Sequence, residues 1–247
     1  MLNLIKINIL KDLWEVKNNK SKLLIGLLVN VFVFFYLYKT MSNKGNVDFF
    51  GVSFELIFIF YLIFIIIISA FSFTSNIIHL EMQNGTLNHF LLAPDKLITA
   101  VIIRSLIHCL KITCLISIVF IFSSFLLNIK ISFISILVVL FFGIISLYGI
   151  GIALSSISLL FKEVRILVSL VKVGFIYFLF KYNENILIPF SNAKQLIFNI
   201  ILNNYSIFDI PLFSIAKIFM NSIIYFIIGI AVFKILEKIS MKKGIQN

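Results

Sequence analysis

Residues 56–71 read LIFIFYLIFIIIISAF, an apolar run that contains no charged side chain. An α-helix needs about 20 mainly apolar residues to cross the hydrocarbon core of a bilayer, at about 1.5 Å of rise per residue. Extended to Gly51 and Ser75, the run reaches that length. It therefore predicts a transmembrane helix.

The composition of the whole chain agrees with this prediction. Of its 247 residues, 61% are hydrophobic and only 13% are charged, which excludes a soluble globular protein. The 29 Phe residues exclude a disordered chain, because disorder requires low hydrophobicity. We infer an integral membrane protein.

Other apolar segments meet or approach the same length. Because they are continuous and lack polar alternation, they indicate helices rather than barrel strands. The predicted fold is all-α, with about six transmembrane helices. The other expected spans are 23–38, 98–127, 132–161, 164–180 and 211–236.

The N-terminal residues 1–22 are predicted to form an amphipathic helix on the inner membrane surface. Apolar residues recur there in steps of three and four from Leu2 to Val16, and Lys6 and Lys11 lie off that stripe. Trp14, the only tryptophan, suits such an interface. The alternative is a cytoplasmic extension of the first span.

Basic residues set the expected orientation. The chain carries 21 Lys and Arg against 10 Asp and Glu, and most basic residues flank the apolar runs. That position is typical of contact with anionic lipid headgroups, so no nucleic acid partner is expected. With both termini in the cytoplasm, the inner side holds Lys6, Lys11, Lys17, Lys20, Lys22, Lys96, Arg104, Lys162, Arg165, Lys234, Lys238, Lys242 and Lys243.

Several kinds of chemistry have no motif in this sequence. It contains no Gly-x-x-x-x-Gly-Lys-Ser/Thr loop for ATP phosphates, no zinc-binding His-Glu-x-x-His helix and no Gly-x-Ser-x-Gly nucleophile turn. Cys109 and Cys114 lie five residues apart in one apolar segment, which suggests neither a disulfide nor a metal site. We expect no catalytic residue, metal or cofactor in this chain.

Two longer connections join the spans. The outer one, 181–210, contains an apolar stretch from Leu196 to Leu202 that is too short to span, so it predicts a re-entrant or interfacial helix. The inner one, 76–97, contains HLEMQNGTLNHFLLAP at 79–94.

The inner connection is expected to form a rigid elbow. Gly85 permits a sharp turn or the close approach of a partner, and Thr86 is a suitable N-cap for a short helix from Leu87 to Leu92. Pro94 ends that helix, while Glu81 could bond to an Arg or Lys of a partner. The alternative is an ordinary loop between two helices.

With these residues the chain resembles the permease subunits of ABC transporters of the type-2 exporter class. That family has a glutamate, an Asn/Asp-Gly-Thr-Leu turn, a Leu-Leu pair and a proline between its second and third spans. The matching residues are Glu81, Gly85, Thr86, Leu87, Leu91, Leu92 and Pro94.

The resemblance implies a transport subunit rather than an enzyme. Two permeases, as a homodimer or a heterodimer with a similar permease, would form the pathway in a bacterial cytoplasmic membrane. Separate ABC ATPase subunits, carrying ATP and Mg, would dock on the matching residues. The cargo classes it implies include drugs, antimicrobial peptides and lipid-like amphiphiles.

Four residues in the spans are candidates for contact with cargo or lipid. Arg104, His108 and Lys111 lie at i, i+4 and i+7 on one helix face, where they could guide an acidic substrate. Alternatively, Arg104 lies at the interface and Lys111 extends back toward it. Glu55 could belong to an outer gate or simply meet water.

Small residues in the fourth span predict close helix packing. They are Gly143, Gly149, Gly151 and Ser155, and the last two lie four residues apart. Rival functions stay open: a secondary transporter or channel without an ATPase, a membrane-embedded enzyme, or a structural membrane subunit.

Overall fold

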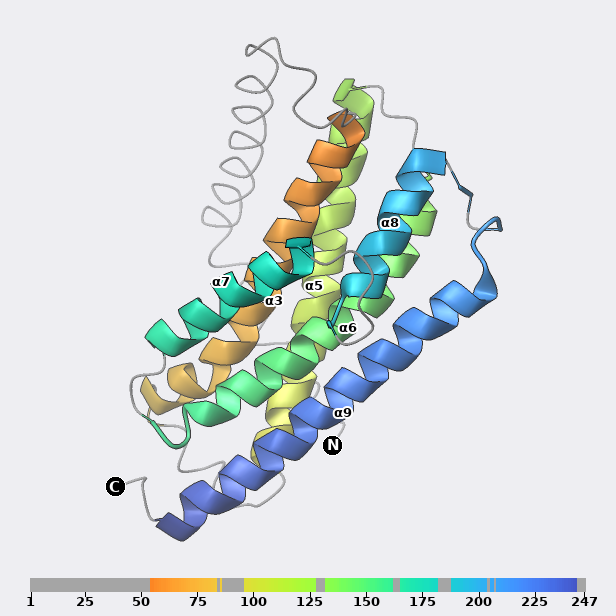
Figure 1. Ribbon diagram of the computed structural model, residues 1–247. Coiled ribbons are helices and arrows are strands. Elements are labelled where there is room, and N and C mark those ends of the chain that lie inside the picture. The colour runs from red at the N-terminus through yellow and green to blue at the C-terminus, as the bar shows by residue number, and fades with distance from the viewer. Residues whose placement is uncertain are drawn as a thin grey trace.

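The computed structural model describes residues 54–83, 85, 96–127, 132–161, 165–181, 188–203, 205–206 and 208–243. All regular secondary structure in this part of the chain is helical, as the sequence predicts (Figure 1). The helices are α3 (Phe54–Gln83), α5 (Lys96–Leu127), α6 (Phe133–Ile157), α7 (Arg165–Lys181), α8 (Ser191–Asn203) and α9 (Leu212–Lys243).

Four of these helices are long and apolar enough to cross a membrane, which indicates a multi-pass membrane protein. Their candidate spans are Phe60–Gln83, Leu97–Ile121, Phe133–Ile157 and Leu212–Lys242, within α3, α5, α6 and α9.

The other elements predicted from the sequence agree with the structure in part or lie outside the described residues. The span predicted at 164–180 coincides with α7, but its apolar part, Val168–Leu179, is shorter than the four candidate spans. The stretch expected to be re-entrant forms part of α8, which already begins at Ser191. The surface helix at 1–22 and the span at 23–38 lie outside the described residues.

Helix α6 is the centre of the bundle. It packs against α3, α5 and α8 and most extensively against α9, which lies beside it in Figure 1. Its sequence is apolar around the whole circumference, as a helix surrounded by other helices requires. Ser146, Ser155 and Ser156 of α6 donate to carbonyls of their own helix, as Ser155 Oγ does to the Ile152 carbonyl at 2.7 Å.

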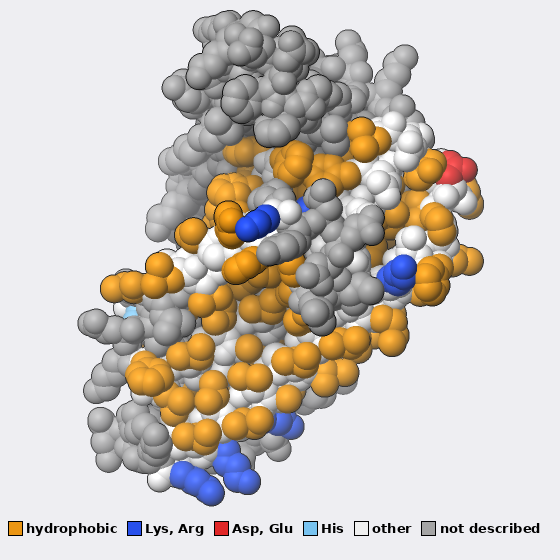
Figure 2. Space-filling view, in the orientation of Figure 1, with side chains coloured by type: hydrophobic (Ala, Val, Ile, Leu, Met, Phe, Trp, Pro, Cys, Tyr) orange, Lys and Arg blue, Asp and Glu red, His pale blue; other side chains and the backbone are white. Residues whose placement is uncertain are grey.

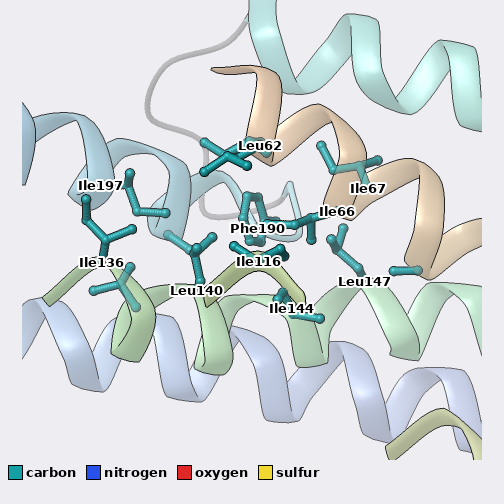
Figure 3. Close-up of a cluster of buried hydrophobic side chains, with 14 of the residues drawn as sticks. Leu62, Ile66, Ile67, Ile116, Ile136, Leu140, Ile144, Leu147, Phe190 and Ile197 are labelled. Atoms are coloured by element: carbon teal, nitrogen blue, oxygen red, sulfur yellow. The ribbon is translucent and has the colours of Figure 1, made fainter. Parts of the chain in front are cut away.

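The main core lies between α6 and its neighbours. Figure 3 shows Ile66 of α3, Ile116 of α5 and Leu140 of α6 meeting at its centre. Phe190, just before α8, inserts into the same cluster and is 1% exposed. Close interdigitation of this kind gives dispersion contacts that lipid chains match less well.

A second core cluster marks one end of the bundle. It joins Ile78 near the end of α3, Leu97 at the start of α5, Leu159 just after α6 and Phe233 near the end of α9. Because α3, α5 and α6 alternate in direction, these termini meet there (Figure 1). We call this the Gly85 end, after the residue that terminates α3.

The outer surface is apolar over large areas. Figure 2 shows hydrophobic side chains covering much of the visible face, with Lys and Arg gathered at the C-terminal end of α9. Exposed apolar side chains include Ile166 of α7 and Ile227 of α9, at 77% and 59%. A surface of this extent suits lipid rather than water.

Candidate functional site

The end of α3 is a glycine-terminated turn. Gly85 has a φ of +67°, and its N–H donates to the Met82 carbonyl at 3.1 Å, a pattern that commonly closes helices. A Cβ at this position would meet no atom within 4 Å. Glycine is therefore favoured here by its left-handed backbone, and not by close contact with another part of the described chain.

The helix extends further into the inner connection than the sequence predicted. We expected the span to end at Ser75, but α3 continues to Gln83, so Glu81 lies in its last turn. The next matching residues, from Thr86 to Pro94, include Leu87, Leu91 and Leu92 and lie outside the described residues.

Glu81 forms an ion pair with Arg104. The guanidinium Nη1 of Arg104, in α5, donates to Oε1 of Glu81, in α3. The Glu81 side chain is 5% exposed and that of Arg104 is 18% exposed, so little water screens the pair. Since charge within a membrane protein is costly, each residue neutralises the other where neither would be stable alone.

This pairing changes the expected grouping of charges. Sequence reasoning placed Arg104 with His108 and Lys111, and it offered Glu81 to a partner protein. In the structure Glu81 already has an arginine from its own chain. A role for Glu81 in binding an ATPase stays a prediction, and it would have to be compatible with this ion pair.

His108 connects three helices. Its Nδ1 lies 2.5 Å from the Tyr148 hydroxyl of α6, within a hydrogen bond. Its ring stacks on Phe73 of α3, with the ring centroids 3.8 Å apart and the planes 8° from parallel. Lys111 lies about one turn further along α5 and is half-buried. The three basic residues of the predicted stripe therefore differ in their surroundings.

The small residues of α6 lie at helix crossings. A Cβ on Gly149 would stand 2.4 Å from the Tyr225 carbonyl oxygen of α9, and one on Gly229 would stand 2.0 Å from the Gly149 oxygen. The backbones of α6 and α9 thus touch at this pair.

Two further α6 glycines contact other helices. A Cβ on Gly151 would overlap Thr74 of α3, with 1.7 Å to its Oγ1, and one on Gly143 would lie 2.5 Å from the Cβ of Ala193 of α8. Ser155, a turn beyond Gly151, is fully buried. These are packing contacts within one chain.

Sequence reasoning missed two lysine contacts. Lys194 of α8, only 2% exposed, donates from Nζ to the Leu179 carbonyl near the end of α7 at 2.7 Å. Lys172 of α7 donates to Ser72 Oγ of α3 at 3.1 Å. The signal available in the sequence was the spacing of Lys194 with Ile197 and Ile201, which places the lysine on one helix face with two apolar residues. In the structure both isoleucines are buried.

The remaining candidates are Glu55, a metal site and the two cysteines. Glu55 lies in the first turn of α3, but its side chain lies outside the described part of the chain. In that part no group of three or more His, Cys, Asp or Glu residues is suited to hold a metal ion. Cys109 is buried, Cys114 is exposed and both are free thiols.

The arrangement suits mechanical coupling between helices. The ion pair joins the last turn of α3 to α5 one turn before Gly85, so a force on the turn acts on both helices. Glycine contacts continue from α3 through α6 to α9.

Comparison with models of protein families, with curated proteins and with solved structures finds no match.

Proposed function

We propose that this chain is the membrane-spanning permease subunit of an ATP-driven exporter, similar to the type-2 class of ABC transporters. The observation that carries the proposal is the Gly85 turn, which closes α3 immediately after the Glu81–Arg104 ion pair. Residues 79–94, which match the family's coupling segment, surround this turn.

In this proposal the chain moves cargo and performs no bond chemistry. Separate ATPase subunits bind ATP and Mg and dock at the coupling segment, and their closure displaces the Gly85 turn. Because the ion pair joins α3 to α5, both helices move together. Tight glycine contacts pass the motion to α6 and α9, which favours a switch between two discrete packings, inward-open and outward-open.

The proposed location is a bacterial cytoplasmic membrane, with both termini and the Gly85 end in the cytoplasm. Support comes from the positive-inside tendency, since exposed lysines of α9 lie toward that end. Two permeases, identical or similar, enclose the pathway. The proposed cargo is an amphiphile such as a drug, an antimicrobial peptide or a lipid-like molecule.

Co-purification tests this proposal. The tagged full chain is extracted in mild detergent, its partners are identified by mass spectrometry, and ATP hydrolysis is measured on the eluate. We expect a stoichiometric partner that carries the phosphate-binding loop this sequence lacks. Gly85→Val should lose that partner, because a β-branched residue rarely adopts a positive φ.

Gly85→Asn is the matched control, because asparagine tolerates the left-handed conformation far better than valine. It should retain the partner, and both variants should stay folded by thermal unfolding in detergent. If no nucleotide-binding partner appears under several mild conditions, the exporter proposal is wrong. A secondary transporter or channel then becomes the leading function, with the His108–Tyr148 pair as its first candidate site.

A further inference from the structure

We propose that the C-terminal turns of α9 form a binding surface for anionic phospholipid headgroups, made by Lys234, Lys238 and Lys242. This surface, the α9 lysine stripe, requires no ATPase partner and is independent of the proposed function. It lies where Figure 2 shows basic side chains gathered at the end of α9.

The three lysines share one helix face. They lie at i, i+4 and i+8, and all three side chains are exposed. Positions four residues apart are neighbours on a helix surface, so the ammonium groups form a row about 12 Å long. Ile235 and Met241 are exposed beside them, at 59% and 44%, which adds apolar contact next to the charges.

The opposite face of α9 is buried against the bundle, so the lysine stripe points away from it. Phe233, Glu237 and Ser240 are buried at 0%, 6% and 0% exposure. The Ser240 hydroxyl donates to the Leu159 carbonyl, just beyond α6, at 3.0 Å. This contact holds the last turns of α9 against the bundle, so the lysines face outward.

Charge in α9 is separated by face. Glu237 is the only acidic residue in the helix, and it belongs to the buried face. The outward face is therefore positive along the whole stripe. Arg104 of α5, at the same end of the bundle, is paired with Glu81, whereas the three lysines of the stripe are exposed.

Helix length places the stripe at headgroup depth. The candidate span Leu212–Lys242 has 31 residues, about 46 Å along its axis, whereas the hydrocarbon core is about 30 Å thick. Lys234 lies about 33 Å along the helix from Leu212, and Lys238 and Lys242 lie about 6 and 12 Å further. If the helix begins at one edge of the core and is tilted by about 20°, Lys234 and Lys238 lie in the headgroup layer of the other leaflet. Lys242 lies about 5 Å beyond that layer, and its flexible stem can reach back toward the phosphates.

Anionic phospholipid is favoured over an acidic protein as the occupant. The lysines start at the edge of the hydrocarbon core, where phosphates are already present at high density. Their alkyl stems can pack on apolar surface while the ammonium groups reach the phosphates. The outcome in which an acidic protein binds instead is part of the test.

The test measures lipid selectivity of the full chain. Protein in mixed vesicles with equal amounts of phosphatidylglycerol and phosphatidylcholine is extracted gently, and retained lipid is counted by native mass spectrometry. We expect enrichment of phosphatidylglycerol. In Lys238→Gln/Lys242→Gln the enrichment should fall about fivefold for each lysine removed, and added salt should reduce the wild-type value.

Lys181→Gln/Lys217→Gln is the matched control, because it removes the same charge from two exposed lysines outside the stripe. It should keep most of the enrichment, and both variants should melt at the wild-type temperature in uncharged detergent. An unchanged enrichment in the stripe variant, or an equal loss in the control, would overturn the proposal. The proposal would also be wrong if the stripe variant lost a bound protein while its lipid selectivity stayed intact. It would be wrong as well if inorganic phosphate alone stabilised the wild type against thermal unfolding as much as phosphatidylglycerol does.

Discussion

Arg104 of α5 donates through Nη1 to Oε1 of Glu81, joining two helices through residues 23 positions apart in the sequence. Both side chains are shielded from water, so the pair behaves as one neutral unit. The unit lies about one turn before the positive-φ glycine that ends α3. We therefore treat the ends of α3 and α5 as mechanically joined.

Removing either partner should strongly destabilise the protein. Glu81→Ala leaves a guanidinium in a poorly hydrated site, and Arg104→Ala leaves a carboxylate, each at a cost of about 3–5 kcal/mol. The double variant should lose less than the sum, with a coupling energy of about 0.5–3 kcal/mol. Unfolding in detergent, followed by circular dichroism against denaturant, gives these values.

A distant pair provides the control for this cycle. Lys217, an exposed lysine near the start of α9, lies at the opposite end of the bundle from Glu81. Glu81→Ala and Lys217→Ala should add within about 0.5 kcal/mol. Additive losses for Glu81 and Arg104 would show that the ion pair contributes no coupling.

The crossing of α6 and α9 should not accept a side chain. Gly149→Ala would bring a methyl group within 2.4 Å of a backbone oxygen, which cannot rotate away. We expect a loss of about 1–3 kcal/mol in the free energy of unfolding. Gly174→Ala in α7 is the matched control, because its Cβ would meet no atom within 4 Å.

The control should be neutral or more stable by about 0.5–1 kcal/mol, since alanine restricts the unfolded chain more than glycine does. Thermal melting of both variants in the same detergent compares them directly. Equal stability of Gly149→Ala and Gly174→Ala would contradict the close crossing.

Lys194 should make stability depend on alkaline pH. Burial lowers the pKa of its ammonium group from the ordinary value of 10.5. Between that lowered pKa and 10.5 the unfolded chain binds more protons than the folded chain, so stability should rise as pH rises through this window. Thermal melting across alkaline buffers measures the slope.

Lys194→Met preserves most of the side-chain volume and removes the titration, so its slope should be flatter than that of the wild type. Lys217→Met, at an exposed site, should keep the wild-type slope. If the melting temperature of wild type and Lys194→Met changes in parallel over the window, Lys194 does not enter the folded structure with a lowered pKa.

Apolar length predicted the central elements well. The span expected at 132–161 is α6, Phe133–Ile157, because a helix buried on all sides is apolar throughout. The C-terminal ends of α3 and α9 were predicted too early, at Ser75 and Leu236, because a hydropathy criterion ends a span where polar and charged residues begin. Glu237 and Ser240 continue α9 beyond that point because their face packs against the bundle.

Long-range pairing was the part that sequence could not supply. A basic spacing of i, i+4 and i+7 grouped Arg104 with His108, and nothing in one sequence indicated that Arg104 meets Glu81 on another helix. The turn at Gly85 was predictable, because an Asn-Gly pair after an apolar helical run is a turn signal, and the φ of +67° at Gly85 agrees. Which glycines meet which helices depends on crossings that only tertiary structure defines.

Site-specific crosslinking tests the central claim most directly. A photoreactive amino acid is placed at Gln83, an exposed residue at the end of α3, and at Phe208, which is 95% exposed before α9 at the other end of the bundle. After irradiation of native membranes, we predict a crosslink from position 83 to a nucleotide-binding subunit and none from position 208. Absence of such a subunit at position 83, or equal crosslinking from both positions, would contradict an ATPase-coupled permease.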